Sequence, residues 1–201
     1  MLGFTDLFDV TGDEKYKKAA FNLCRSSLTF QKDSGRFVTS RSDESTHLHP
    51  HAYSAEGLLY AGVYFKKEEF IDSAVKAVEW ALDSQLADGG IPKKFENGNF
   101  IPFYRSDILA QMLRLGVLLR GLRKLDMKYD VHLEKLYKKL LSFQYLGPGE
   151  QSGGFFYGTS LDGVERAHLN SWCTMFAFQA MIMYEDIYLT NSKIEKVEYF
   201  I

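Results

Sequence analysis

The chain has 201 residues, of which 46% are hydrophobic and 25% are charged, so it is long enough for one folded domain with a sizeable core. Its formal net charge is −2 and no block of lysine or arginine stands out, which argues against binding to nucleic acid or to an anionic membrane. Two cysteines, Cys24 and Cys173, are too few for a disulfide scaffold and fall within helical patterns. They indicate buried free thiols in a reducing, cytoplasmic compartment.

In chain order, two kinds of predicted helix alternate. Amphipathic helices, with apolar side chains at helical spacing between charged ones, are expected over residues 14–31, 69–85 and 131–144. Helices that are apolar nearly all round are expected over residues 52–65, 108–122 and 171–184. The last of these lies in an uncharged span that is barely long enough for a bilayer and holds several polar residues, so we expect a buried helix and no membrane span. Two layers of helices explain the alternation: inner helices are covered by neighbours on every side, and outer helices have one face exposed to solvent.

The connections alternate as well. Short turns lead from each inner helix to the next outer one, whereas long loops lead back. Each long loop begins with a glutamine followed by glycine and apolar residues, at Gln31, Gln85 and Gln144. The regular spacing of these glutamines predicts an all-α fold made of repeated helical hairpins.

Hairpins of this period, whose outer helices end in Gln before glycine and an aromatic residue, resemble the (α/α) toroids. These include six-hairpin glycosidases, sugar 2-epimerases and, more distantly, terpenoid cyclase and prenyltransferase barrels. The stretch FDVTGDEKYKKAA is also similar to the Thr-Gly-Asp turn between hairpin helices in the glycosidase-like group. The resemblance covers nearly the whole chain, and it implies that the long loops and the N-termini of the inner helices share one face around a central cavity.

A full toroid of this type has six or seven hairpins, whereas this chain has roughly three and a half. We expect residues 1–201 to form a single partial or open toroid, the C-terminal portion of a full one, with a last outer helix within residues 191–201. Either an N-terminal half is missing, or the arc pairs with a second copy. The edge expected to mediate a homodimer is apolar: Leu2, Phe4, Leu7 and Phe8.

Three loops are predicted to bring polar side chains to one end of the molecule, where helix N-termini favour polar ligands. We predict the catalytic residues to be His49, His51, His168, Asp107 and Glu56. We predict the substrate-binding residues to be Arg105, Tyr53, Asn170, Trp172 and Glu165. Alternate histidines in the stretch HLHPH suggest metal ligands, but no second ligand cluster accompanies them, so neither a metal nor another cofactor is expected.

Each of these residues has a plainer alternative. Asp107 or the preceding Ser106 is suited to cap a helix, and Asn170 is suited to cap the last inner helix. Glu56 lies on a helix that is apolar on all sides, where an unpaired carboxylate is costly. It is expected either to pair with Arg105 or a histidine, or to line the cavity.

The leading functional hypothesis is a carbohydrate-active enzyme, a hydrolase, lyase or epimerase, that acts on a sugar or uronide by general acid–base chemistry. In it, His49 or His51 opposes His168, and Asp107 or Glu56 is the carboxylate partner; the paired histidines are similar to those of sugar 2-epimerases. An isoprenoid enzyme is less favoured because no Asp-rich motif is present. The third hypothesis is a non-catalytic half-toroid that binds a small molecule, an oligosaccharide or a protein.

Overall fold

The computed structural model describes residues 2–159 and 164–189. The α-helices in these ranges are α1 (Leu2–Thr11), α2 (Glu14–Leu28), α3 (Leu48–Phe65), α4 (Glu68–Asp83), α5 (Ser106–Gly121), α6 (Asp130–Leu141) and α7 (Ser171–Tyr188). A short 3-10 helix, η1 (Met127–Tyr129), precedes α6. The strands are β1 (Thr46–His47), β2 (Lys94–Glu96), β3 (Asn99–Ile101), β4 (Phe156–Thr159) and β5 (Glu165–Leu169).

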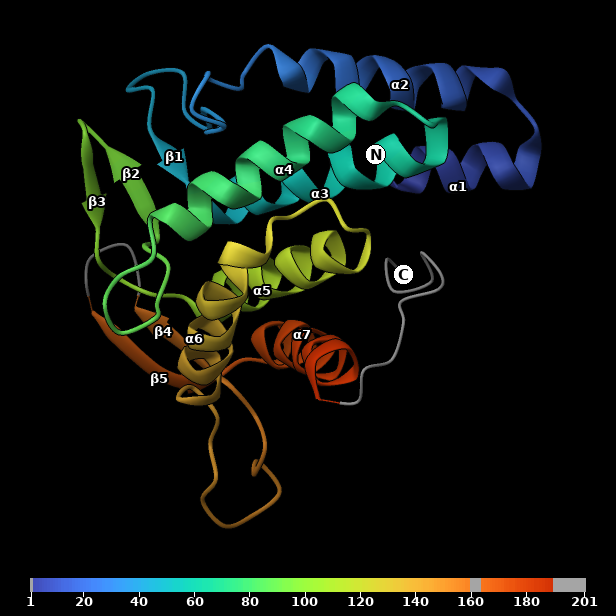
Figure 1. Cartoon of the computed structure of the whole chain (residues 1–201). Coiled ribbons are helices and arrows are strands. Elements are labelled where there is room, and N and C mark those ends of the chain that lie inside the picture. The colour runs from blue at the N-terminus through green and yellow to red at the C-terminus, as the bar shows by residue number, and fades with distance from the viewer. Residues whose placement is uncertain (1, 160–163, 190–201) are drawn as a thin grey trace.

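Consecutive helices form hairpins, as predicted. The pairs α1–α2, α3–α4 and α5–α6 pack within each hairpin, and α7 packs against α5 as the inner helix of a fourth (Figure 1). Helix α5 is buried along its length from Ser106 to Leu119, because α3, α4, α6 and α7 all contact it. Helix α2 buries only Ala20 and Cys24. The two expected kinds of helix are therefore seen in the covered helix α5 and the half-wet helix α2. Helix α7, which was expected to be covered on every side, instead leaves Trp172, Met175 and Phe178 exposed on one face.

Glycines on the inner helices allow the layers to approach closely. A Cβ atom placed on Gly62 of α3 would lie 2.9 Å from the backbone nitrogen of Ile71 in α4. A Cβ on Gly116 of α5 would lie 2.4 Å from Cδ2 of Leu133 in α6. A Cβ at Gly62 would meet backbone, so the α3–α4 hairpin depends on glycine at this point. At Gly116 the contact is with the end of the Leu133 side chain, which can shift.

The glutamines that begin the long loops connect each loop to the next hairpin. Gln31 donates its side-chain amide to the carbonyl oxygen of Gly35 at 2.9 Å and to that of Ser73, in α4, at 2.8 Å. Gly35 has a φ of +93°, and a Cβ there would lie 2.2 Å from the carbonyl oxygen of Lys76. The loop can pack directly on the next outer helix only because glycine is present.

The second loop repeats this arrangement one hairpin later. Gln85 donates to the carbonyl oxygens of Gly89, at 3.0 Å, and of His132 in α6, at 2.9 Å. In the third loop, Gln144 donates to the carbonyl oxygen of Gly153 at 3.3 Å. The repeated glutamine seen in the sequence thus has a structural cause, since it satisfies buried backbone carbonyls where a loop turns back.

Short strands in the long loops bring these loops together on one rim. Strand β1 pairs with β2, and β2 pairs with β3, in one antiparallel sheet, while β4 and β5 form a second. Thr46 lies opposite Phe95, and Arg105 forms a bridge with Gly158, so the first loop contacts the second and the second contacts the third. Figure 1 shows all five strands at the end where α3, α5 and α7 begin. The single rim predicted from the connections is therefore present.

Helix α3 begins at Leu48, four residues before the predicted start. The histidine stretch HLHPH therefore lies mostly inside the helix and not in an extended loop. His47 is the N-cap residue, and Pro50 lies in the first turn, where proline is tolerated. His49 and His51 are therefore helical and point to different sides, unlike alternate residues of an extended segment.

The apolar side chains of the inner helices, the buried faces of α4 and α6, and Phe37, Ile91 and Phe155 from the loops form one hydrophobic core. Among the described residues, no helix combines the length and hydropathy that a membrane crossing requires. The outer helix expected within residues 191–201 lies outside the described part of the chain.

Candidate functional site

Two polar stripes face each other across the neighbouring inner helices α3 and α5. Residues spaced four and seven apart share one face of a helix. The α3 stripe consists of His49, Tyr53 and Glu56, and the α5 stripe consists of Asp107, Gln111 and Arg114. Contacts join the stripes at the loop end, where His49 meets Asp107, and two turns deeper, where Glu56 meets Arg114.

Asp107 is the centre of the contacts at the loop end. Its side chain is 1% exposed and accepts hydrogen bonds from Nε and Nη2 of Arg105, at 3.1 and 2.6 Å. Its Oδ1 also accepts from the backbone N–H of Ile108 at 2.9 Å, near the positive end of α5. Nδ1 of His49 lies 3.4 Å from Oδ2 of Asp107. A buried carboxylate that is fixed by a guanidinium and faces an imidazole is suited to orient that ring and to stabilise its charged form.

His49 is a neutral imidazole at pH 7. Burial lowers its pKa below the ordinary 6.5, and Arg105 lowers it further, whereas the carboxylate of Asp107 opposes this shift. The contact with Asp107 is close enough for an ion pair but does not have hydrogen-bond geometry, since Nδ1 has no hydrogen-bond partner in the described residues. Catalytic contacts of this length commonly shorten when substrate binds.

Glu56 pairs with Arg114, a partner that the sequence reading did not propose. The two side chains form an ion pair across α3 and α5, and they are only 10% and 4% exposed. Arg114 also lies over the ring of Phe176, 5.7 Å from its centroid. The carboxylate that is costly on an apolar helix is thereby neutralised within the helix layer.

Aromatic side chains cover the stripes from α3 and α7. Tyr53 lies edge-on to His49 at 4.8 Å, and Phe176 lies between Tyr53, at 6.5 Å, and Trp172, at 5.2 Å. Trp172 is 51% exposed and Tyr53 is 39% exposed. The structure thus brings two of the predicted substrate-binding aromatics together at the solvent edge, where such rings are suited to stack on a sugar.

His168 joins the same cluster through a tyrosine. Its ring stacks on the ring of Tyr157, with the two centroids 5.3 Å apart. The guanidinium of Arg105 also lies over the Tyr157 ring, 4.8 Å from its centroid. A continuous series of contacts therefore runs from His168 through Tyr157 and Arg105 to Asp107 and His49. Burial raises the pKa of Tyr157, which keeps its hydroxyl protonated.

His51 does not reach this cluster. It is fully buried on the other side of α3, where Nδ1 accepts the backbone N–H of Phe37 at 3.2 Å and Nε2 lies 3.0 Å from the carbonyl oxygen of Ala77. Trp80 packs edge-on against it at 5.0 Å. Both ring nitrogens are occupied, so His51 joins the first loop to α4 rather than facing a ligand.

Asn170 was expected either to bind substrate or to cap the last inner helix, and in the structure it caps that helix. Its side chain caps α7 by accepting the N–H of Cys173 at 3.0 Å. Ser106 donates its hydroxyl to the carbonyl oxygen of Phe156 at 2.6 Å and so fixes the third loop to the start of α5. The side chain of Glu165 lies outside the part of the chain that the structure describes.

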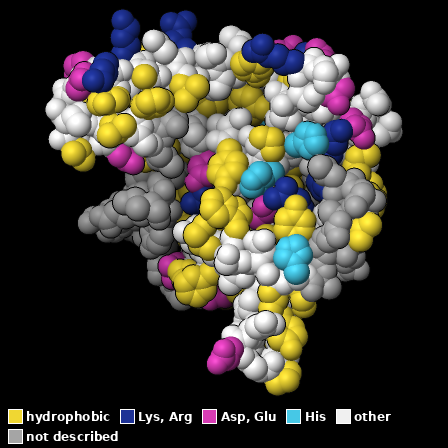
Figure 2. Space-filling view, turned by 180° about the vertical axis from the view of Figure 1, so that it is seen from behind, with side chains coloured by type: hydrophobic (Ala, Val, Ile, Leu, Met, Phe, Trp, Pro, Cys, Tyr) yellow, Lys and Arg dark blue, Asp and Glu magenta, His cyan; other side chains and the backbone are white. Residues whose placement is uncertain are grey.

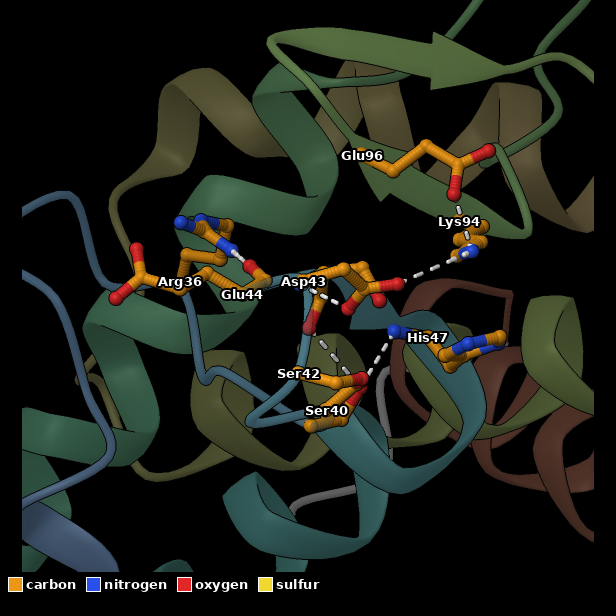
Figure 3. Close-up of polar contacts among 10 residues, drawn as sticks. Arg36, Ser40, Ser42, Asp43, Glu44, His47, Lys94 and Glu96 are labelled. Carbon is orange, nitrogen blue, oxygen red and sulfur yellow. Dashed lines mark hydrogen bonds and ion pairs between the residues drawn. The ribbon is translucent and has the colours of Figure 1, made fainter.

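A polar network holds the loop that carries His47, as Figure 3 shows. Arg36 donates to the carbonyl oxygen of Glu44 at 2.7 Å, and the backbone N–H of His47 donates to Thr39 Oγ1 at 2.7 Å. Lys94 of β2 pairs with Glu96 and lies 4.0 Å from Asp43. Within the described residues, no three histidine, cysteine or acidic side chains come together as a metal site.

The face behind the view of Figure 1 is hollowed, and histidine, acidic and basic side chains gather there among hydrophobic ones (Figure 2). A separate cavity of about 780 Å³ lies against the other side of α7, between Met175 and Phe178 and the loop at Gly153 and Gly154. This cavity is mostly apolar and lies away from His49 and Asp107. The charged and imidazole groups converge at the stripes, which makes the stripes the candidate site.

Gln111 and Arg114 are the site residues that the sequence reading missed. The signal for Arg114 is present in the sequence, since it is a charge seven residues beyond Asp107 on a helix otherwise apolar all round. Gln111 falls on the same stripe, four residues beyond Asp107. Glu56 on α3 and Arg114 on α5 carry the same signal, since each is a charged residue on a helix that is otherwise apolar on all sides.

Comparison with known proteins supports the fold and identifies no family. No protein-family model matches the sequence, and no curated protein sequence matches it either. Solved structures do resemble it. Cellobiose 2-epimerase from Bacillus thermoamylovorans B4167 has a TM-score of 0.70 at 14% identity, covering 90% of this chain and 50% of that one. An unsaturated glucuronyl hydrolase from Streptococcus agalactiae has a TM-score of 0.70 at 18% identity, covering 90% and 55%.

A D-mannose isomerase is similar over more of the chain, with a TM-score of 0.72 at 13% identity, covering 99% of this chain and 56% of that one. At such identities the likeness concerns the fold alone. All of these structures are (α/α) toroids of the six-hairpin glycosidase-like type. The chain therefore has the fold of an (α/α) toroid, and it spans about half the length of the solved proteins it resembles.

Proposed function

We propose that this chain is half of a carbohydrate-active enzyme, a hydrolase, lyase or epimerase that acts on a sugar or uronide by general acid–base chemistry. The observation that carries the proposal is His49, which faces the buried carboxylate of Asp107, itself fixed by Arg105 at 2.6 Å. The sugar enzymes among the structural neighbours make this chemistry plausible for the fold.

In the proposed mechanism, Nδ1 of neutral His49 carries the proton toward Asp107, and Nε2 keeps its lone pair as the base. When Nε2 takes a proton from the substrate, the imidazolium forms beside the Asp107 carboxylate and is stabilised by it. Trp172 and Tyr53 provide aromatic surface for the sugar ring. His168, on the far side of Tyr157, is the candidate for the second acid–base group.

The test is proton NMR of mono- and disaccharides, together with an unsaturated uronide, incubated with the protein in deuterated water. Hydrolysis, elimination and exchange at C2 each leave a distinct signature. We expect His49→Gln to lower the rate at least about 100-fold. His47→Gln, in the same loop with a half-buried ring, is the matched control and should retain the rate. Equal rates for both variants would exclude His49 as the base.

The pH dependence of the rate gives a second check. Because burial holds the pKa of His49 below 6.5, the base stays available at pH 7 and is lost only when it is protonated in acid. We expect the acid limb of the pH–rate profile, where His49 takes up its proton, to lie below pH 6.5. A rate that already falls between pH 8 and pH 7 would contradict this assignment.

The second candidate is a non-catalytic half-toroid that binds a sugar or a protein, favoured by one observation: the chain spans about half of each toroid that it resembles. Sugar binding without turnover in the NMR assay would favour this candidate. Both cysteines are buried and unpaired, which fits our placement of the protein in the cytoplasm.

We also propose that a second copy of the chain, or a separate N-terminal half, covers the two ends of the arc. Large apolar side chains are exposed at both ends: Phe4, Leu7 and Val10 on α1, and Met175, Phe178 and Ile182 on α7. Exposed apolar surface of this extent commonly marks an interface. A purely monomeric sedimentation profile at micromolar concentration would exclude the homodimer and leave the separate half.

A further inference from the structure

We infer that the two stripes bind an uncharged sugar rather than a uronide, and that Gln111 and Arg114 form a subsite for its hydroxyl groups. This inference rests on the proposed function and narrows its substrate class. Four observations support it: unpartnered polar atoms, the chemistry of the Gln111 amide, the pairing of the charges, and the aromatic edge through which a ligand enters.

Polar atoms without partners are concentrated on the stripes. Four buried side-chain atoms on the stripes have no hydrogen-bond partner among the described residues: His49 Nδ1, Gln111 Nε2, Gln111 Oε1 and Arg114 Nε. Elsewhere in the described chain the corresponding atoms, Ser45 Oγ and His132 Nδ1, are scattered. Each such atom costs about 1–3 kcal/mol when it stays unpaired. A cluster of them at the proposed site is explained by a ligand that pairs them.

Gln111 is the centre of this cluster. It is 1% exposed and lies one helical turn from Asp107 and one from Arg114. Burial lowers the pKa of His49 and raises the pKa of Tyr53, and the amide is near enough to both side chains to oppose each shift. An amide donates and accepts, as a sugar hydroxyl does, whereas a carboxylate only accepts. The amide is therefore suited to a hydroxyl partner.

The charges on the stripes cancel in pairs. The guanidinium of Arg105 binds the carboxylate of Asp107, and that of Arg114 binds Glu56. His49 is neutral at pH 7 because burial lowers its pKa.

A uronide carboxylate bound at the stripes would therefore lie close to two carboxylates, while both arginines are already paired. Burying an unpaired charge there is costly, whereas a neutral sugar needs only hydrogen bonds. The charge balance thus favours the uncharged member of any sugar–uronate pair.

A ligand enters past the aromatic edge. Tyr53 is 39% exposed and stands on the same α3 stripe as His49, so it is the part of that stripe nearest to solvent. Trp172 and Phe176 stay in place on α7 and provide the surface for the ring. In this arrangement, the apolar face of the sugar lies on the tryptophan and its hydroxyls turn toward Gln111 and Nε of Arg114.

The experiment compares each of three sugars with its own uronate, which differs from it only at C6. Glucose, mannose and galactose, and the corresponding uronates, are titrated into the full chain at millimolar concentration, with calorimetry and saturation-transfer NMR as readouts. The variants are Gln111→Met, which keeps the side-chain length but removes the amide, and Glu56→Gln, which leaves Arg114 unpaired. Gln151→Met changes an exposed glutamine and is the matched control.

We expect a neutral sugar to bind the unchanged protein at least tenfold more tightly than its uronate. Gln111→Met should weaken that binding at least tenfold without lowering the melting temperature, and Glu56→Gln should shift preference toward the uronate. A uronate that binds as tightly as its neutral partner, or binding unchanged in Gln111→Met, would overturn the inference and leave the proposed function standing. If none of the six sugars binds the unchanged protein, the proposed function fails together with the subsite.

Discussion

The protonation of His51 should make the protein sensitive to acid. The ring is fully buried, with Nδ1 accepting from Phe37 N–H and Nε2 against the carbonyl oxygen of Ala77. Burial lowers its pKa from 6.5 to about 4. In the unfolded chain the same ring takes up its proton near pH 6.5, so between these values the unfolded state binds more protons than the folded state. Stability must therefore fall as the pH falls through this window.

The size of the effect follows from the width of the window. A shift of one pKa unit corresponds to about 1.4 kcal/mol, so the change from 6.5 to about 4 amounts to about 3 kcal/mol of unfolding free energy. A domain of this size is stable by only about 5–15 kcal/mol, so this loss is a large part of the total. It should be complete near pH 4, since below that value both states hold the proton.

The assay is urea unfolding of the wild type and His51→Gln, followed by tryptophan fluorescence at half-unit steps from pH 7.5 to pH 4. The variant loses some stability at every pH, but it lacks the titrating ring. We expect the difference in unfolding free energy between the two proteins to shrink as the pH falls, with a slope approaching 1.4 kcal/mol per unit. Burial also lowers the pKa of His47 and of His49, but both rings are present in both proteins, so their effects cancel. A difference that stays constant from pH 7 to pH 4 would refute the assignment of His51 as a buried neutral ring.

Two further predictions concern the scaffold. Gln85→Leu removes the donor to two backbone carbonyls and should cost roughly 1–3 kcal/mol in urea unfolding, whereas Gln151→Leu, at an exposed position, should cost almost nothing; equal effects would show that the repeated glutamine has no structural role. Burial raises the pKa of Cys24 to about 11 and also raises that of Cys173, so both thiols should react with a disulfide reagent at pH 8 only after denaturant is added. Rapid reaction of either thiol in the native protein would contradict its burial.

The helices were predictable because their signals are local. Apolar periodicity over a dozen or more residues predicts six of the seven described α-helices, α2 to α7, and the repeated glutamine gives the order of hairpins. The start of α3 was placed four residues late. Its N-cap residue, His47, makes no side-chain capping bond, and Pro50 has the appearance of a helix breaker although it lies in the first turn. Because of that error, His49 and His51 were treated as equivalent.

Strand β1 could not be predicted because it depends on a contact distant in sequence, whereas the β2–β3 hairpin turns at Asn97 and Gly98 and has a local signal. Strand β1 has two residues, and its partner β2 begins about fifty positions later. A strand so short has no pattern of its own. It forms because the rim brings the loops together, and the long loops then satisfy backbone groups across one another. The position of His168 beside Tyr157 depends on the antiparallel pairing of the consecutive strands β4 and β5.

The buried polar residues of the inner helices separate what a sequence can reveal from what it cannot. A helix covered on all sides cannot hold a charge without a partner, so Glu56 on α3 and Arg114 on α5 together predict an ion pair between these helices. No such rule applies to Gln111, because a buried amide has no required partner of fixed sign. Only the coordinates show that its partners are missing. A buried amide without hydrogen bonds costs stability, and a ligand that pairs it, as we infer for position 111, would remove that cost.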